Sequence, residues 1–159
     1  MALQFSPATL AKYREILARY PQRQAALLPT LWLAQQEFGW LSEEALAYVA
    51  DLMELPAARV AGVASFYTMF YKEPVGKYHL QVCRTLSCAL RGAADITACI
   101  EKRLGIRAGE TTSDKKFTLS EVECLASCGT APMLQLNEDY VENLDEKSVL
   151  ELIDRLEKD

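Results

Sequence analysis

The chain has 159 residues, half of them hydrophobic, and its 17 Lys and Arg against 22 Asp and Glu give a net charge of −5. This length suffices for one ordinary domain or two small ones, with a core that needs no disulfide. The acidic balance excludes the basic surface of a nucleic-acid binder, and no apolar run approaches the ~20 residues of a membrane span. The N-terminal stretch shows no signal-peptide pattern, so we expect a cytoplasmic protein, in which structural disulfides are rare.

The first seventy residues predict four short amphipathic helices, because apolar residues recur every three or four positions. Helix start and stop signals flank these segments: Ser6, Pro7, Pro29, Gly39, Ser42 and Pro56. A helix is expected over 22–38, in which Pro29 marks either a kink or the true start and Gly39 forms the C-cap. Four such helices indicate a small bundle.

From Lys77 onward the hydrophobic period changes to two, which is typical of strands. The expected order is strand 77–83, helix 89–105, strand 116–124, strands 132–136 and 140–144, and a closing helix 145–159 capped by Asp145. The segment YKEPVGK is the only plausible linker. The sequence therefore predicts an α+β protein with a helical bundle over 1–74 and a mixed sheet of about four strands over 75–159.

Four of the five cysteines form two pairs, and both pairs lie at the ends of predicted strands. Cys83 closes the first strand and Cys124 follows the second, with Cys88 and Cys128 shortly after them. Loops at the same end of a sheet bring four thiolates together, and a [2Fe–2S] cluster needs two sulfur ligands on each of its irons. A plant-type ferredoxin requires a cysteine where the chain has Arg91, and a Rieske site requires two histidines where the chain has only His79.

Zinc remains the strongest rival metal, because structural zinc sites use similarly tight cysteine spacings. A redox or structural thiol role is a third alternative. The loops favour a cluster, since they are rich in small and hydroxyl residues that let backbone N–H groups turn toward sulfur. Those residues are Thr85, Ser87, Ala126, Ser127, Gly129 and Thr130. The fifth cysteine, Cys99, lies on or beside the apolar stripe of its helix and is expected to be a small core residue rather than a ligand.

The pattern Cys83-x4-Cys88 followed by Cys124-x3-Cys128-x3-Pro132, with LRG shortly after Cys88, resembles the thioredoxin-like [2Fe–2S] ferredoxin family. The resemblance extends into the helical half, where residues 31–56 and 63–78 look like the N-terminal domain of the E-subunits of bacterial NADH:quinone oxidoreductase, respiratory complex I. It covers nearly the whole chain.

This resemblance implies a thioredoxin-like fold for 75–159 and a peripheral subunit docked on the flavin-bearing F-subunit, which binds NADH and FMN. Cys83 and Cys88 would ligate one iron, and Cys124 and Cys128 the other. The cluster would exchange single electrons with the flavin, and the complex would lie at the inner membrane. Ala126 stands where the family more often has glycine, which changes the loop if that residue must adopt positive φ.

The residues themselves offer no NADH site, since neither a Gly-x-Gly-x-x-Gly motif nor a Walker A loop is present. Other functions stay open: a diaphorase subunit of an NAD-linked hydrogenase or formate dehydrogenase, a zinc-stabilised interaction module, or a free-standing ferredoxin. The helical half offers aromatic residues for docking, although a place in the core is the favoured interpretation for each of them. These residues are Trp32, Trp40, Phe66, Tyr67, Phe70 and Tyr71.

Overall fold

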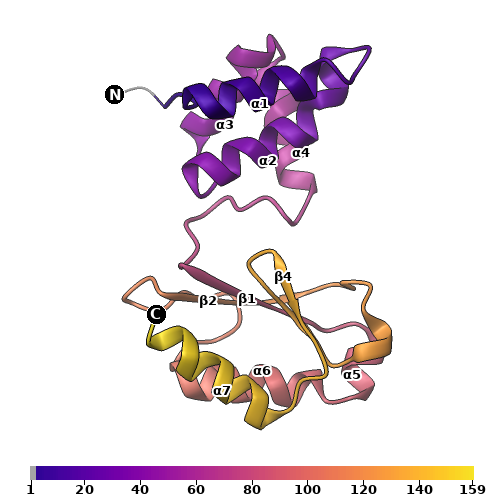
Figure 1. The fold of residues 1–159 in the computed structure, drawn as a ribbon, viewed down its shortest axis with the longest axis vertical. Coiled ribbons are helices and arrows are strands. Elements are labelled where there is room, and N and C mark those ends of the chain that lie inside the picture. The colour runs from indigo at the N-terminus through magenta and orange to yellow at the C-terminus, as the bar shows by residue number, and fades with distance from the viewer. Residues whose placement is uncertain (1–2) are drawn as a thin grey trace. The chain divides into compact units, whose positions relative to one another are not determined.

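The computed structural model describes residues 3–159, and the chain divides into two compact units. The first unit ends at Pro74 and consists of helices, whereas the second runs from Val75 to Asp159 and contains every strand of the described residues. Each unit has its own hydrophobic core. Figure 1 labels the α-helices of both units and the strands β1, β2 and β4.

Within residues 3–74 the helical unit contains four α-helices, and two of them start at serines that cap them as the sequence predicts. Their bounds are α1 Pro7–Leu17, α2 Leu27–Phe38, α3 Glu43–Met53 and α4 Ala57–Phe66. The Ser6 hydroxyl accepts from the Thr9 amide and the Ser42 hydroxyl from the Ala45 amide, each a cap worth about 1 kcal/mol.

The start of α2 resolves the two roles that the sequence left open for Pro29. A 3-10 turn over Arg23–Ala26 precedes α2, and Pro29 is the third residue of the helix. There the missing N–H of proline is harmless, because the first four amides of a helix have no intrahelical acceptor. Pro29 therefore marks a helix start and not a kink, and Gly39 with φ +82° ends the helix.

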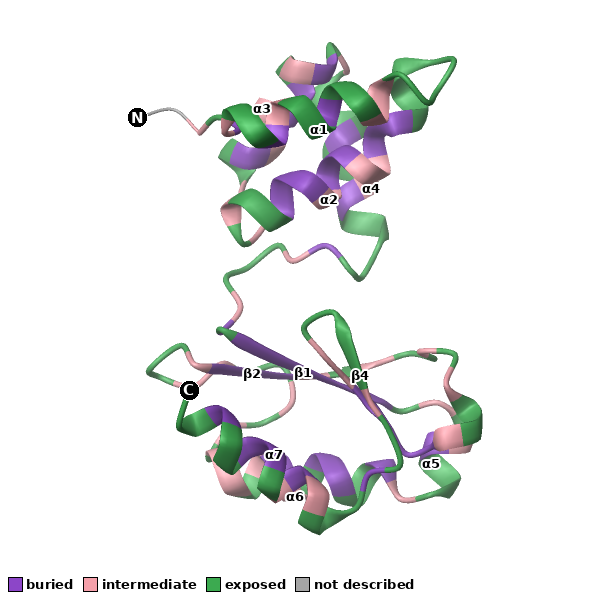
Figure 2. Ribbon diagram, viewed as in Figure 1, coloured by how far each residue is buried: buried purple, intermediate pink, exposed green. Residues whose placement is uncertain are grey.

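In the second unit a four-stranded mixed sheet has the order β2-β1-β3-β4. The strands are β1 Tyr78–Cys83, β2 Phe117–Val122, β3 Leu134–Leu136 and β4 Asp139–Val141. Parallel pairing joins β1 to β2, whereas β3 is antiparallel to both β1 and β4. All six residues of β1 are buried, which Figure 2 shows as a continuous purple strand.

Helices α6 (Ala93–Leu104) and α7 (Glu146–Glu157) lie side by side on one face of this sheet (Figure 1). The core between them and the sheet includes Leu80, Ile100 and Ile153. The predicted single helix over 89–105 is wrong. It is divided into α5 (Leu86–Leu90) and α6, because Gly92 adopts φ +93° and interrupts the helical backbone.

No helix within residues 3–159 has both the length and the apolar character required to cross a lipid bilayer. The longest helices have twelve residues, about 18 Å at 1.5 Å per residue, and each presents a polar face.

Candidate metal centre

The parallel pairing of β1 and β2 brings both cysteine loops to one edge of the sheet. Cys83, the last residue of β1, lies opposite Val122, the last residue of β2. The Arg84 amide extends this pairing by donating to the Val122 carbonyl at 3.0 Å. Since Cys124 follows two residues later, the carboxyl ends of two neighbouring strands deliver both cysteine loops.

The first cysteine pair belongs to the core of its unit. Cys83 ends β1, Cys88 lies in α5, and their exposed fractions are 3% and 2%. The Cys83 amide donates to the Met133 carbonyl at 3.2 Å, which ties this residue to the segment before β3. The peptide bond between Ala131 and Pro132 in that segment is cis.

The second cysteine pair is exposed, and its two sulfurs lie 3.9 Å apart. Two thiolates on one tetrahedral metal ion, with bonds of ~2.3 Å, are separated by about 3.8 Å. The sulfurs of Cys124 and Cys128 therefore already have the spacing of two ligands on one ion. Between them Ala126 adopts the left-handed conformation with φ +63°, and its amide donates to the Cys124 sulfur at 3.3 Å.

Backbone amides also surround the buried pair. Burial by itself would raise the pKa of Cys83, yet hydrogen bonds from the Thr85 and Leu125 amides outweigh burial and lower that pKa. Burial raises the pKa of Cys88, and its hydrogen bond to Cys83 raises it further. The pKa of Cys83 thus responds to the Leu125 amide, which belongs to the second loop.

Within residues 3–159, no three His, Cys, Asp or Glu side chains gather around a point that would hold a single ion. The cysteines instead form two pairs at one edge. Amides point at Cys83, Cys88 and Cys124, as expected of loops built from small and hydroxyl residues. Two ligand pairs with amides directed at sulfur fit a group that contains two irons.

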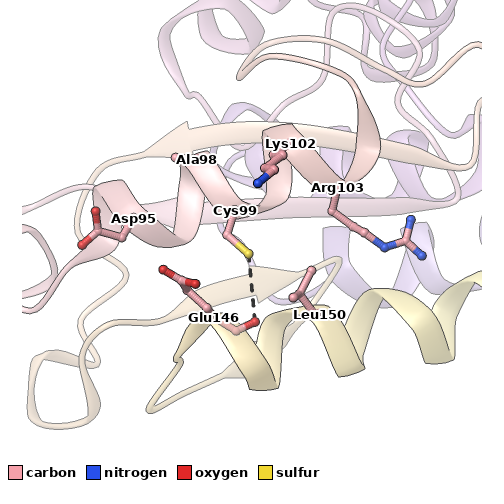
Figure 3. Close-up of a pocket in the computed structure, with 7 residues that line it drawn as sticks. All are labelled: Asp95, Ala98, Cys99, Lys102, Arg103, Glu146 and Leu150. Atoms are coloured by element: carbon pink, nitrogen blue, oxygen red, sulfur yellow. Dashed lines mark hydrogen bonds between the residues drawn. The ribbon is translucent and has the colours of Figure 1, made fainter.

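The fifth cysteine lies elsewhere, on the face of α6 that packs against α7. The Cys99 sulfur is 4.0 Å from the Glu146 carbonyl oxygen, and the residue is half-buried beside the core rather than inside it. Figure 3 shows it lining an open pocket of about 510 Å³ between the two helices. Burial raises the pKa of this thiol, so it has no thiolate character at neutral pH.

Three side chains for which the sequence predicted no role at the site contact the second cysteine loop. The Arg91 Nε donates to the Ala131 carbonyl at 2.6 Å, and the Tyr140 hydroxyl donates to the Leu125 carbonyl at 2.6 Å. The Glu142 carboxylate accepts from hydroxyl groups of the same loop. Only Arg91 had a signal in the sequence, because it belongs to the LRG motif; the other two lie in or just after a strand far along the chain.

In the helical unit the aromatic residues divide between core and surface. Phe70 is 1% exposed and belongs to the core, whereas Phe66 is 76% exposed and Met69 is 43% exposed. The two tryptophans, Trp32 and Trp40, are half-buried. The apolar surface of this unit therefore centres on the C-terminal end of α4.

Comparisons with known proteins agree with this geometry. The family model for thioredoxin-like [2Fe–2S] ferredoxins matches residues 13–157. The chain belongs to this family. The resemblance seen in the sequence is thus confirmed, and so is its implication of a [2Fe–2S] protein with an α+β fold.

Among sequence relatives of this ferredoxin, the E-subunit of NADH-quinone oxidoreductase in Rickettsia conorii is 48% identical over 158 residues, which covers 98% of this chain and 95% of that protein. The mitochondrial NADH dehydrogenase [ubiquinone] flavoprotein 2 of Dictyostelium discoideum is 45% identical over 155 residues, or 96% of this chain and 63% of that one. Both relatives are subunits of oxidoreductases.

Among solved structures, a chain of an NAD+-reducing [NiFe]-hydrogenase in the air-oxidized state superposes with a TM-score of 0.75 at 24% identity. The match covers 87% of this ferredoxin but 24% of the hydrogenase chain. The H2-reduced state gives a TM-score of 0.72 at 25% identity. These similarities confirm the fold across most of the chain.

Proposed function

We propose that this chain is an electron-transfer subunit of an NADH:quinone oxidoreductase and holds one [2Fe–2S] cluster. The observation that carries the proposal is the meeting of two cysteine pairs at one sheet edge, where the paired strands β1 and β2 end. The near full-length similarity to E-subunit proteins supports the choice of complex.

In this proposal Cys83 and Cys88 ligate one iron, and Cys124 and Cys128 ligate the other. When bound, the cluster supplies reversible storage of a single electron. The chain supplies the ligands and the surroundings of the cluster. The buried pair anchors one side in the core, and the amides of Thr85, Leu125, Ala126 and Met133 offset negative charge on sulfur.

The two cysteine pairs differ in exposure, which indicates the side at which electrons enter and leave the site. Because Cys124 and Cys128 are exposed while Cys83 and Cys88 are buried, the second pair is the side a redox partner approaches. We infer that this partner is the F-subunit of complex I, with its FMN and NADH, since this chain carries no dinucleotide-binding motif. NADH, FMN and quinone then bind to other subunits, and the chain lies on the cytoplasmic side, attached to the inner membrane through the complex.

The cluster is tested by metal analysis of protein purified without oxygen. We expect two irons and two acid-labile sulfides per chain, a brown colour, and an EPR signal after reduction. Stoichiometric zinc without visible absorption, in protein kept anaerobic throughout, would instead establish the zinc-stabilised interaction module.

A diaphorase subunit of an NAD-linked hydrogenase or formate dehydrogenase is the second candidate. It is favoured by the superposition on the hydrogenase chain. That chain is longer, and the part that matches this fold is about a quarter of it. The higher sequence identity to E-subunit proteins favours the first candidate. Purification of the tagged chain from its native host decides between them, because the co-purifying subunits carry a quinone-reducing, a hydrogenase or a formate dehydrogenase activity.

We also propose that the helical unit docks the partner, while Val75–Asp159 alone forms the ferredoxin domain. All four proposed ligands lie in the second unit, so the helical unit is not needed for ligation. A stable obligate interface often buries ~2,000 Å² or more, which a single small domain supplies with difficulty. A truncated chain beginning near Lys77 is expected to bind a cluster but not the flavin-bearing partner in co-expression pull-downs. Equal recovery of the partner by both forms would refute the docking role.

A further inference from the structure

The second cysteine loop, residues 123–131, has only its last residue, Ala131, in the hydrophobic core, so the core supports it less than the first. Cys124, Ala126 and Cys128 are exposed, and the only helical backbone in the loop is the 3-10 turn Cys128–Thr130. Leu125 packs against the core only partly. Burial of apolar surface therefore cannot by itself hold the two sulfurs at their 3.9 Å spacing.

Polar contacts from one short segment, β4 and the two residues after it, hold this loop instead. The Tyr140 hydroxyl donates to the Leu125 carbonyl at 2.6 Å, and the amide of Asn143 donates to the Thr130 carbonyl at 2.7 Å. Between these two contacts, the Glu142 carboxylate reaches the loop. The segment therefore contacts the loop on both sides of Cys128.

The Glu142 contact is the most specific of the three. One carboxylate oxygen, Oε1, accepts from the hydroxyl of Thr130 at 2.6 Å and also from the hydroxyl of Ser127. The two hydroxyl oxygens also lie 2.7 Å from each other, which is hydrogen-bond distance, so the three side chains form one connected cluster. Ser127 and Thr130 lie on either side of Cys128 in the sequence. Through these hydrogen bonds Glu142 links the two ends of the turn that contains Cys128.

We propose that Glu142 is a positioning residue that pre-organises Cys124 and Cys128 for the metal through the hydroxyls of Ser127 and Thr130. This inference rests on the proposed function, because it assigns a role toward the cluster's exposed iron. Glu142 is itself exposed and belongs to neither hydrophobic core, so its contacts serve the loop rather than the packing of the unit.

Two physical effects follow from this arrangement. A held turn keeps both sulfurs at ligand spacing, so iron is released more slowly than from a free loop. A nearby carboxylate also adds negative charge, which favours the oxidised cluster and lowers its reduction potential. The hydrogen bonds from Ser127 and Thr130 lower the pKa of Glu142, so the carboxylate is ionised at neutral pH.

The test compares Glu142→Ala, Glu142→Gln and Asp139→Ala in the full-length protein. Asp139 is a matched control, because it is an exposed carboxylate on the same β4 for which no side-chain hydrogen bond or ion pair is found within residues 3–159. Loss of visible absorption in the presence of an iron chelator gives the release rate. We expect Glu142→Ala to release iron roughly tenfold faster and to have a higher reduction potential.

Glu142→Gln keeps an acceptor oxygen but loses the charge. Its iron release rate should be close to that of the wild type, whereas its reduction potential should stay raised as in Glu142→Ala. A general loss of stability would not change one of these quantities without the other. Asp139→Ala should behave as wild type in release rate. If Glu142→Ala and Asp139→Ala release iron at the same rate, Glu142 has no positioning role.

A second readout needs no cluster and separates this inference from the proposed function. Hydrogen exchange of the metal-free protein should show faster exchange of the amides of residues 124–130 in Glu142→Ala than in Asp139→Ala. Equal exchange refutes the pre-organisation. A wild-type protein that binds zinc but shows this exchange difference refutes the proposed function and leaves the positioning role standing.

Discussion

The two cysteine loops solve one problem, the presentation of two sulfurs, by different means. The first places Cys83 and Cys88 inside the hydrophobic core, where a strand end and a short helix fix them. The second leaves Cys124 and Cys128 exposed, and polar contacts from β4 and beyond hold the loop. A buried pair gives a firm base, whereas an exposed pair gives access, and an electron-transfer site needs both.

Serine substitution at each cysteine tests this asymmetry most strongly. Cys88→Ser should abolish cluster assembly, because the new hydroxyl is buried among apolar residues and the core cannot adjust to its shorter bond to iron. Cys128→Ser should retain an oxygen-ligated cluster with an altered spectrum, since the exposed loop can move. Reconstitution followed by EPR and iron analysis measures both outcomes.

Cys99→Ser serves as the control for this series and should keep the wild-type EPR signal. Cys99 undergoes the same chemical change as the other cysteines, but its sulfur faces α7 and not the cysteine loops. Bleaching by Cys99→Ser together with an unchanged signal in Cys88→Ser would contradict the assignment of the ligands.

The buried residue His79 makes the free energy of unfolding depend on pH. His79 is 5% exposed in β1 and lies 2.8 Å from the Ser120 hydroxyl, and burial lowers its pKa to about 4. The unfolded chain takes up a proton near pH 6.5, whereas the folded chain does so only near pH 4. Stability is therefore fully present above pH 6.5 and declines as the pH falls.

The linkage amounts to about 2 kcal/mol of unfolding free energy between pH 7 and pH 5. His79→Gln should remove this part of the pH dependence, as followed by urea unfolding of the metal-free chain with circular dichroism. Equal pH slopes for the two proteins would show that His79 takes up its proton as readily in the folded state as in the unfolded chain.

Much of this architecture could be predicted from local signals. The capping residues Ser6, Ser42 and Asp145 and the C-cap Gly39 act within a few residues of themselves, so the sequence is enough to find them. The break at Gly92 was missed, although glycine there was the available signal, because the apolar period continues on both sides of it.

The polar supports of the second loop were not predictable in this way. Glu142 and Tyr140 meet residues 12 to 15 positions earlier in the chain, and the register of the β3–β4 hairpin decides which side chains reach the loop. No periodicity encodes that register. The cysteine spacing predicted where ligands lie, but not what holds them.

Arg91 tests whether the two loops are mechanically coupled. Its Nε donates to the Ala131 carbonyl at 2.6 Å and so joins the end of α5 to the second loop. Arg91→Ala should lower the unfolding free energy by about 1 kcal/mol, the usual net value of one hydrogen bond, and accelerate cluster loss. Arg59→Ala, at an exposed position on α4, is the matched control and should change neither.

The smallest effect is expected at Ala126, where the exposed loop adopts an unfavourable backbone conformation. With φ +63°, the Cβ of alanine is disfavoured, and glycine removes that cost, which is roughly 1 kcal/mol. Glycine also gains freedom in the unfolded chain, so Ala126→Gly should stabilise the protein by only a few tenths of a kcal/mol.

Ala98→Gly, the same chemical change at an exposed position inside α6, provides the contrast. It should destabilise the protein by about 1 kcal/mol, because glycine is unfavourable in a helix. The opposite signs of the two substitutions, measured by urea unfolding, would show that the second loop stores backbone strain that its polar supports offset. If Ala126→Gly destabilises as much as Ala98→Gly, the left-handed turn carries no strain, and the loop needs less support than we infer.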